Sequence, residues 1–526
     1  MRRISIVPAV MLILILAAAV PAAAQEAKSP LSLSLEDCIV KALRDNLGVA
    51  IQVLGPESAA EGVNAAQEKY IPSLSLSYQS RKTENAAFSY LDSPGDSTIN
   101  RSRNYNFLTA TQALPTGGTM NLNFTGYRTT TNQRGITIDP RYGTTLSFGL
   151  SQPLLKNFGF KINRREIIVA KNNLGVSEET LKNTLMTTVY SVESAYWNLV
   201  YSIENLAVRQ QSLQLAKDLL EKNQRSVEVG TLAPMEVLSA RAEVATREAD
   251  LIQAETQIKS NEDQLKLLLG ISEPEDANYP AVMPKDKPTY VVRQVALEEA
   301  LAAAIANRPD LEISRIGIES DKLNLSYAKN QVLPEVNLSA SYSSPGIDGT
   351  RIFYIGNPLE GNIDYTVPGD ISGALKQTMK FTYPNWNLGL TLNLPLSNFF
   401  GRANLAQARL NMRQALLELE QKKQDVYLEV KNAVRSVEAN YKRILAYTTA
   451  RELAEQKLAA EEEKRRVGMS TNYMVLSYQR DLANARISEL NAIISYNVSL
   501  ASLERSMGTN LKAKNINLSD YAPGLD

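Results

Sequence analysis

The feature that most restricts the fold is an internal duplication, because the second half of the chain repeats the plan of the first. The segments Leu35–Ile39 and Leu297–Leu301 begin similar predicted helices 262 residues apart. Pro153 and Pro395, each at the end of a strand-like stretch, are 242 residues apart. The offset falls inside the strand region, so the first copy carries about twenty extra residues there. We expect each copy to follow the order helix, strand region, very long helix, turn, helix.

The N-terminus has the pattern of a secretory signal peptide. Arg2 and Arg3 precede an uncharged apolar run at 4–20, and a small-residue cleavage site ends at Ala24. The sequence therefore predicts a signal peptide over residues 1–24. An N-terminal membrane anchor is the alternative interpretation of the same run.

Helical periodicity gives both copies the same set of helices. Repeat one, residues 25–286, is predicted to contain helices at 35–70, 162–229 and 235–269. Repeat two, residues 287–526, is predicted to contain helices at 297–332, 402–467 and 473–507. Apolar residues recur every seven positions from Leu185 to Val227, which is typical of a coiled-coil seam. Since the two shorter helices of a copy together match the long one in length, we expect them to stack end to end beside it.

Four stretches alternate apolar with small polar residues: 74–78, 146–151, 336–342 and 386–394. This alternation fits a membrane β-barrel and equally a half-buried soluble sheet. Just past the last strand of each copy lie two phenylalanines, which we interpret as an interfacial aromatic girdle: Phe158, Phe160, Phe399 and Phe400.

The connections between these strands differ between the copies. In copy one, 104–113 and 119–128 predict an additional hairpin that could lengthen a barrel, cap it or add strands to it. In copy two, residues 344–385 are rich in Gly, Pro, Asp and Asn and predict a long loop. The segment 271–296, together with 509–526, is interpreted either as an irregular belt around the helices or as a plain linker.

Composition excludes several classes of chemistry. The chain has no histidine, so it has no imidazole base and no histidine-ligated zinc site. It has a single cysteine, Cys38, which excludes an intrachain disulfide and which we expect to be a buried hydrophobe. Basic and acidic residues are balanced at 56 each, so no bulk charge favours nucleic acid. We therefore expect no enzyme activity, no cofactor, no metal and no nucleic-acid partner.

The signal peptide, the duplicated plan and the Val-Gly turns at 229–230 and 467–468 resemble the TolC-type outer-membrane efflux proteins. The resemblance implies an α+β membrane protein that forms a homotrimer. Each chain would give four strands to a shared transmembrane β-barrel, and the barrel would continue as a long α-helical coiled-coil tunnel built from two internal repeats. Such a protein lies in the outer membrane, among its lipids, with the helical part in the periplasm.

The resemblance also implies a function and partners. The protein would be the passive exit duct of a tripartite efflux or secretion system, docked on a periplasmic adaptor that connects it to an inner-membrane pump. A structural or adhesive outer-membrane protein with a coiled-coil stalk is the alternative. The sequence gives no indication of the cargo.

Two turns between long helices are the predicted adaptor-docking tip: Val229, Gly230, Thr231, Leu232, Val467, Gly468, Met469 and Ser470. Glycine there supplies a left-handed residue that ends a helix, and Thr, Ser or Asn caps the next one. The same residues also make good helix-hairpin turns without any further role.

The family's ionic gate is not carried over intact, because Met474 and Ser477 stand at two of its acidic positions and Ser470 at a basic one. A substitute gate is predicted from Glu236 together with Arg465 or Arg466. The alternative is that these three are solvated charges at helix ends.

Overall fold

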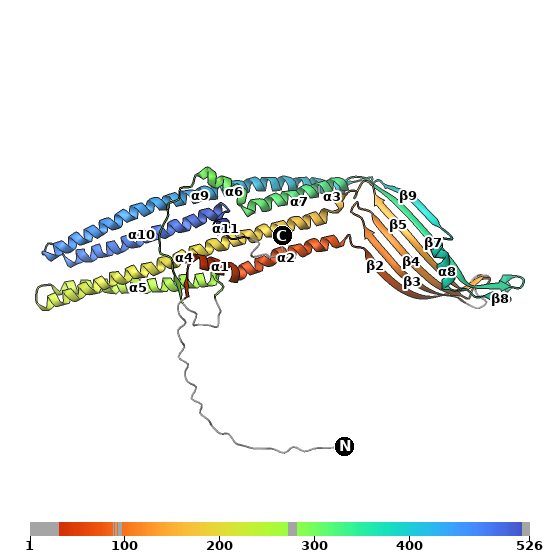
Figure 1. Ribbon diagram of the computed structural model, residues 1–526, viewed down its shortest axis with the longest axis horizontal. Helices are drawn as coiled ribbons and strands as arrows, with labels where there is room; N and C mark the ends of the chain where they lie inside the picture. The colour runs from red at the N-terminus through yellow and green to blue at the C-terminus, as the bar shows by residue number, and fades with distance from the viewer. Residues whose placement is uncertain (1–30, 88, 90–91, 93–96, 272–280, 518–526) are drawn as a thin grey trace, which may run out of the picture.

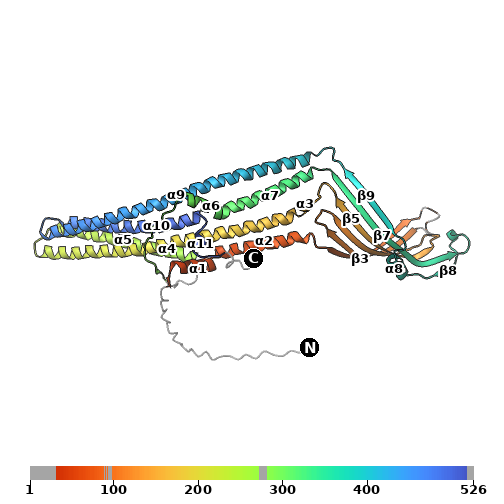
Figure 2. The ribbon, with the colours of Figure 1, turned by 45° about the horizontal axis from the view of Figure 1, so that its top comes forward.

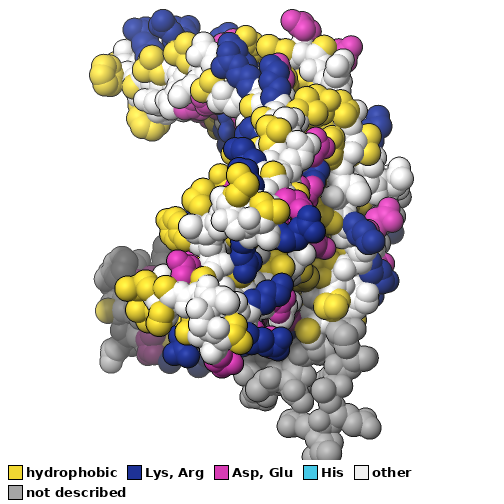
Figure 3. All heavy atoms as spheres, turned by 90° about the vertical axis from the view of Figure 1, so that its left-hand side faces the viewer, with side chains coloured by type: hydrophobic (Ala, Val, Ile, Leu, Met, Phe, Trp, Pro, Cys, Tyr) yellow, Lys and Arg dark blue, Asp and Glu magenta, His cyan; other side chains and the backbone are white. Residues whose placement is uncertain are grey.

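The molecule is elongated, with helices along most of its length and a sheet at one end (Figure 1). The computed structural model describes residues 31–87, 89, 92, 97–271 and 281–517. The predicted signal peptide therefore lies outside the described residues, as do parts of the predicted belt. Seen from the helical end, the chain forms an arc around a hollow that is open on one side (Figure 3).

The first half contains two short strands, four long strands and five helices within the described residues. In chain order these are β1 Leu31–Leu33, α1 Leu35–Asp45, α2 Leu47–Glu68, β2 Ser73–Ala86, β3 Ser97–Ala113, β4 Thr119–Thr131, β5 Ile138–Pro153, α3 Phe160–Asn163, α4 Arg165–Glu228, α5 Pro234–Leu268 and β6 Val282–Pro284. The predicted long helix and the predicted hairpin are both present, as α4 and as β3–β4.

The second half, over the residues described, repeats the long helices but has fewer long strands. Its elements are α6 Leu297–Asn307, α7 Pro309–Gln331, β7 Glu335–Tyr354, η1 Pro358–Glu360, β8 Ile363–Val367, α8 Ile371–Met379, β9 Asn385–Asn393, α9 Phe399–Arg466, α10 Asn472–Ser506 and α11 Asn510–Ala513. In Figures 1 and 2 the α4–α5 and α9–α10 pairs run to the same end of the molecule.

Among the described residues the main sheet has seven strands, ordered β2-β3-β4-β5-β7-β8, and β9 also pairs with β7. Every pairing in it is antiparallel. Strand β9 pairs with residues 335–343 of β7, and β8 pairs with residues 351–354. The predicted hairpin is thus inserted in the sheet between β2 and β5, which settles that it adds strands to this sheet.

The prediction of one continuous helix at 35–70, and of another at 297–332, is wrong. Each is divided in two, at Asn46 and at Arg308, where the backbone becomes extended. Asn46 caps α2, because its side-chain oxygen accepts hydrogen bonds from the amides of Gly48 and Val49. At the second break Pro309 occupies the first turn of α7, where a proline is accepted but forces the preceding residue out of the helical conformation.

The prediction of a long loop at 344–385 is also wrong. Strand β7 continues to Tyr354 and is paired with β5 as far as Arg351, and α8 packs on these two strands. The Thr378 hydroxyl of α8 lies 2.7 Å from that of Thr144, and the Ser344 hydroxyl donates to the Thr378 carbonyl at 2.9 Å. Composition misled the prediction because α8 is short and begins with an Asp370 cap in a Gly- and Pro-rich stretch.

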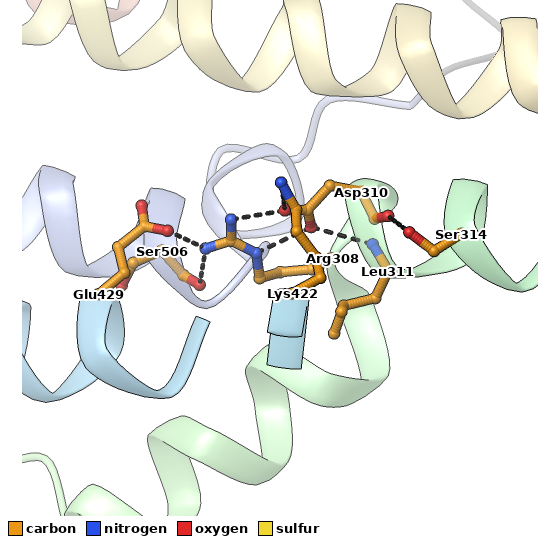
Figure 4. Close-up of polar contacts among 7 residues, drawn as sticks. All are labelled: Arg308, Asp310, Leu311, Ser314, Lys422, Glu429 and Ser506. Carbon is orange, nitrogen blue, oxygen red and sulfur yellow. Dashed lines mark hydrogen bonds and ion pairs between the residues drawn. The ribbon is translucent and has the colours of Figure 1, made fainter. Parts of the chain in front are cut away.

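The short helices stack end to end, as expected, and a pair of equivalent glycines lies at the two joints. Helix α5 ends under the start of α2, where the Asn46 side-chain amide donates to the Leu268 carbonyl at 2.9 Å. Helix α10 ends under the start of α7, where the Arg308 guanidinium donates to the Ser506 carbonyl at 3.2 Å (Figure 4). Gly270 follows the first joint and Gly508 the second, both with positive φ.

The second joint is held by charge as well. Arg308 also contacts Asp310 at 2.9 Å and Glu429 at 2.6 Å, and Lys422 lies 3.4 Å from Asp310 (Figure 4). Burial opposes the charged form of Asp310, but the hydrogen bond and charge of Arg308 outweigh it and lower the pKa of that carboxyl.

The largest buried core lies where α1, α4 and the short parallel pair β1–β6 meet. It includes the predicted seam residues Leu185, Val192 and Leu199, which are completely buried. Cys38 belongs to the same core, as predicted, and burial raises the pKa of its thiol to about 12. Over the residues described, no helix has a stretch that is both long and apolar enough to cross a membrane.

Candidate functional site

The sheet has one apolar and one polar face, because successive side chains of a strand point to opposite sides. One row across β5, β7 and β9 consists of Phe148, Tyr342 and Trp386, which face each other in register. The next row, one residue away along each strand, consists of Ser147, Ser343 and Asn385. The apolar row is exposed, with Trp386 retaining 78% of its accessible surface. An apolar face that is exposed at this row and covered by α8 only farther from the helices, beside Thr144 and Ser344, together with a polar face on the other side, suits a wall between lipid and water.

The four predicted girdle phenylalanines lie at the junction of this sheet with the helices. Phe158 follows β5 and Phe160 begins α3, while Phe399 and Phe400 begin α9. All four are exposed, Phe399 and Phe400 to about 80%. Their exposure at this level is what an interfacial position requires, and the girdle role stays a prediction.

The first tip turn, between α4 and α5, has the conformation that its glycine predicts. Gly230 has φ +76°, and the Thr231 amide donates back to the Ser226 carbonyl at 2.8 Å, which closes the end of α4. The predicted capping of α5 by Thr231 is wrong, because the Thr231 hydroxyl donates to Ser226 instead. The N-cap residue of α5 is Ala233, followed by Pro234 at the first helical position.

The other three predicted residues of this turn surround Gly230. Val229 is exposed to 74%, Thr231 is exposed and Leu232 is half-buried. The turn therefore presents a small apolar surface at the extreme end of the helical pair.

The second tip turn, between α9 and α10, repeats this geometry with a different set of contacts. Gly468 has φ +78°, and the Met469 amide donates to the Lys464 carbonyl at 2.8 Å. Here the predicted capping is confirmed, since the Thr471 hydroxyl accepts from the Met474 amide. Val467 and Met469 are exposed to 63% and 77%, so this tip also carries an apolar surface.

Ser470 ties the second turn to its own helix. Its hydroxyl donates to a Glu461 carboxylate oxygen at 2.6 Å, and Lys464 contacts the other oxygen at 3.1 Å. The Ser470 hydrogen bond, with the charge of Lys464, lowers the pKa of Glu461. The sequence did not predict this contact, because an acidic residue nine positions before a serine is equally typical of a helix end where both side chains are solvated.

The predicted gate residues are not brought together within one chain. In the described part of the chain no hydrogen bond or ion pair links Glu236 to Arg465 or Arg466. Arg466 contacts Glu463 on its own helix at 2.6 Å. Burial lowers the pKa of the Arg465 guanidinium, and nearby Glu462 only partly offsets this. Any gate formed by these residues would depend on contacts between copies, and it stays a prediction.

Two arginines that sequence reasoning did not select as site residues link the helices near the tips. Arg247 of α5 is 5% exposed and donates to the Ser212 carbonyl of α4 at 2.7 Å and the Leu476 carbonyl of α10 at 3.1 Å. Arg451 of α9 contacts Glu489 of α10 at 2.7 Å. No pattern in the sequence marked Arg247, whereas Arg451 interrupts a weaker apolar heptad repeat over residues 430–458 of the second copy.

A polar cavity of about 1000 Å³ lies between the two helical pairs, which also pack against each other through α4 and α10. It lies between α4, α5, α9 and α10, and most of its lining side chains are polar, among them Asn198, Asn261, Asn432, Asn440 and Asn491. A polar lining accommodates water, so the inner surface between the pairs is wettable.

Comparison with protein families gives one family model that covers most of the chain. It is described as outer membrane efflux protein and matches residues 38–271 and 300–509. Outer membrane protein TolC of Escherichia coli is 24% identical over 346 residues, which are 66% of this chain and 66% of that protein. Outer membrane efflux protein BepC of Brucella suis is 23% identical over 68% of this chain and 71% of its own length. The chain thus spans about two thirds of the length of these relatives.

Solved structures of the same overall shape cover nearly the whole chain. The CmeC outer membrane channel of Campylobacter jejuni has a TM-score of 0.63 at 16% identity and covers 94% of this chain and 90% of its own. The MtrE outer membrane channel of Neisseria gonorrhoeae, in its open state, has a TM-score of 0.61 at 19% identity and covers 91% and 89%. At these identities the likeness concerns the fold.

Proposed function

The chain belongs to the outer membrane efflux protein family, and we propose that three copies of it form the exit duct of an efflux or secretion system. The duct lies in the outer membrane, with the sheet as the membrane wall and the helices as a tunnel in the periplasm. Cargo leaves through it passively, because selection and energy come from the partners.

One observation carries this proposal: an antiparallel sheet with a polar face and with an apolar face that is exposed beside the helices continues directly into those long helices. Strand β5 passes into α3 and α4, and β9 passes into α9, within a few residues. A coiled-coil stalk with an adhesive role has no need of such a sheet. A wall that separates lipid from water does, and the polar face then lines the passage.

Oligomerisation follows from the shape of one chain. The arc in Figure 3 encloses no passage by itself, and the strands of one copy are fewer than the eight of the smallest membrane barrels. Three copies around one axis are the family's arrangement, and we adopt it here. The two halves of each chain would then provide successive sectors of the tunnel.

We assign adaptor docking to the two exposed tip turns. Val229, Val467 and Met469 present apolar side chains at the far end of the helices, where a helical hairpin of an adaptor can pack against them. A Cβ on Gly230 or Gly468 would meet no atom within 4 Å, so a large side chain there projects outward and strains only the backbone of the turn, whose φ is positive.

A pair of substitutions tests the docking role. Gly468→Trp adds bulk to the tip and should abolish crosslinking to the adaptor in cells while the trimer persists. Gly468→Asn is the matched control, since asparagine accepts the left-handed conformation at low cost and should keep crosslinking. Equal crosslinking of both variants would contradict the assignment of docking to this turn.

The duct itself is tested with the purified protein. We expect a trimer from the outer-membrane fraction that gives discrete current steps in a planar lipid bilayer. A monomeric or trimeric protein that gives no current under any condition, including after removal of the tip turns, would contradict the proposal and favour the stalk.

A further inference from the structure

The inserted hairpin β3–β4 continues both faces of the sheet without interruption. The apolar row extends from Phe148 through Leu122 of β4 and Ala110 of β3 to Leu74 of β2. The polar row extends from Ser147 in the same way through Asn123, Thr109 and Ser75. Each row therefore crosses six strands with one side chain from each and keeps its character throughout. A hairpin that capped the sheet or projected from it would not need this two-sided pattern.

The hairpin also spans the full height of the wall, because its turn is fixed at the junction with the helices. The Thr116 hydroxyl in the turn donates to the Gln152 side chain at 2.7 Å, and the Thr116 carbonyl accepts from the Gly159 amide at 3.0 Å. Gly117 has φ +98°, and a Cβ on it would lie 2.2 Å from the Asn157 carbonyl oxygen. This close packing anchors the turn beside the start of α3.

Because the insertion consists of two strands rather than one, the two edge strands of the sheet still run in opposite directions. Strand β2 leaves the helices and β9 returns to them, so the two edge strands run in opposite directions. Both are exposed along nearly their whole length, and the backbone groups on their outer sides have no partner strand among the described residues. An antiparallel partner that presents the same two rows would satisfy them, and a second copy of this chain does so.

We propose that β3 and β4 belong to the membrane wall, so that each copy contributes six strands and β2 of one copy pairs with β9 of the next. This inference rests on the proposed threefold duct. Three copies then close a barrel of eighteen strands, because each gives β2, β3, β4, β5, β7 and β9, while β8 pairs only with residues 351–354 at the far end of β7 and is not counted. The family resemblance implies twelve strands instead. Because barrel diameter grows roughly in proportion to strand number, the exit is about one and a half times as wide.

Cysteine labelling tests the place of the hairpin. Single variants are made on its polar row, Thr109→Cys and Asn123→Cys, and on its apolar row, Ala110→Cys and Leu122→Cys. Ser147→Cys and Phe148→Cys on β5 are the matched controls. Native Cys38 can stay, since it is completely buried and does not compete for a thiol reagent. The purified trimer in lipid vesicles is treated with a charged, membrane-impermeant methanethiosulfonate.

Thr109→Cys and Asn123→Cys should be labelled as fast as Ser147→Cys, and at least about tenfold faster than Ala110→Cys and Leu122→Cys, whose thiols face lipid. Equal labelling of both rows of the hairpin, with a tenfold difference between Ser147→Cys and Phe148→Cys, would overturn the inference and leave the duct intact. Loss of that difference on β5 as well would overturn the proposed membrane wall itself.

Closure between copies is tested by disulfides. Ser77→Cys on β2 is combined in turn with Asn387→Cys, Gly389→Cys or Thr391→Cys on β9, all on the polar face. One combination should give crosslinked dimers and trimers on a denaturing gel. Ser343→Cys with Asn385→Cys, which pair within one chain, should give no increase in mass. Absence of intermolecular products from all three combinations would overturn the pairing of β2 with β9.

Discussion

The two joints between stacked helices occupy the same place in the two halves of the chain but use different side chains. In the first half the neutral amide of Asn46 donates to the Leu268 carbonyl and also caps α2. In the second half Arg308 donates to the Ser506 carbonyl and is held by two carboxylates. Asn46 and Arg308 are 262 residues apart, and Leu268 and Ser506 are 238 apart, which are the offsets of the duplicated sequence.

The two joints share a glycine, which directly follows the helix that ends at the joint: Gly270 after α5 and Gly508 after α10. A Cβ on Gly270 would lie 2.3 Å from the Asp45 carbonyl oxygen, and one on Gly508 would lie 2.9 Å from that of Asn307. Close approach of one backbone to another leaves no room for a side chain, whereas any donor of suitable length can reach a helix-terminal carbonyl. Each joint therefore requires a glycine at this position, whereas the side chain that donates to the helix-terminal carbonyl can be of different types.

The sheet differs between the halves far more than the helices do. In the first half the hairpin β3–β4 lies in the sheet between β2 and β5. In the second half α8 follows β7 and packs on β5 and β7. Among the described residues, α1, α2, α4 and α5 have counterparts in α6, α7, α9 and α10, because each of these helices must meet a neighbour along its length. A sheet, in contrast, can take up an even number of strands without changing its edges.

Deletion of residues 97–131, which removes β3 and β4 as a pair, should produce the largest effect. The wall would fall from six strands per copy to four. Polymer exclusion from the outer side should show an exit about one third narrower, with trimer assembly unchanged. Deletion of 357–383, which removes α8 and β8, is the control and should leave the width as it is. An exit of equal width in the wild type and in both deletion variants would contradict the claim that β3–β4 belongs to the wall and α8–β8 does not.

Gly270→Ala should destabilise the trimer more than Gly508→Ala, because the added Cβ meets backbone at a shorter distance. Both residues have positive φ, which adds strain to the clash. We expect a loss of about 3 kcal/mol for Gly270→Ala and about 2 kcal/mol for Gly508→Ala. Thermal unfolding in detergent measures this. Gly62→Ala in α2, where a Cβ would meet no atom within 4 Å, should be neutral or slightly stabilising.

Removal of the donor sharpens the comparison of the joints. Arg308→Ala leaves the half-buried Asp310 with the more distant Lys422 as its cationic partner and should cost about 2 kcal/mol. Asn46→Ala loses one cap and one hydrogen bond and should cost about 1 kcal/mol. Arg308→Lys cannot bind Asp310 and Ser506 with one forked group, and its loss of stability should lie between those of Arg308→Ala and Asn46→Ala. A larger cost for Asn46→Ala would show that the ion pairs contribute less than the cap.

Acid should weaken the second joint selectively, although this is the smallest of the expected effects. The folded pKa of Asp310 is lowered, so its ion pairs stabilise the fold above the ordinary value of 3.8 and are lost as the pH falls through the lowered pKa. The amide of Asn46 does not titrate in this range. Hydrogen exchange at the start of α7 should therefore accelerate on acidification more than at the start of α2. Asp310→Asn should remove this difference, and its persistence in that variant would assign it to another group.

Local signals predicted the regular parts of the fold well. The heptad seam from Leu185 predicted α4, and the alternation around Leu146 and Leu388 predicted β5 and β9. Gly230 and Gly468 predicted the left-handed ends of α4 and α9. All of these depend on neighbours within one or two turns or strands, which a sequence displays directly.

Features that depend on distant partners were not predictable in this way. The break at Asn46 is stabilised by Leu268, and Arg247 finds its acceptors on two other helices. Nothing local assigned the hairpin to the wall, because that requires the register of β3 against β2 and of β4 against β5. The substitute gate of Glu236 with Arg465 or Arg466 would depend on contacts between copies, and it stays a prediction.

The central claim, that the halves match in the tunnel and differ in the wall, is tested most directly by electron cryo-microscopy of the trimer in lipid. Among the described residues of one chain, α2, α4, α7 and α9 pack side by side nearer the sheet, and α5, α4, α10 and α9 pack side by side nearer the tip turns. The account predicts twelve helices around the axis at both levels, four from each copy, below a barrel of eighteen strands, six from each. A barrel of twelve strands with β3 and β4 outside it, or any arrangement without a threefold axis, would contradict it.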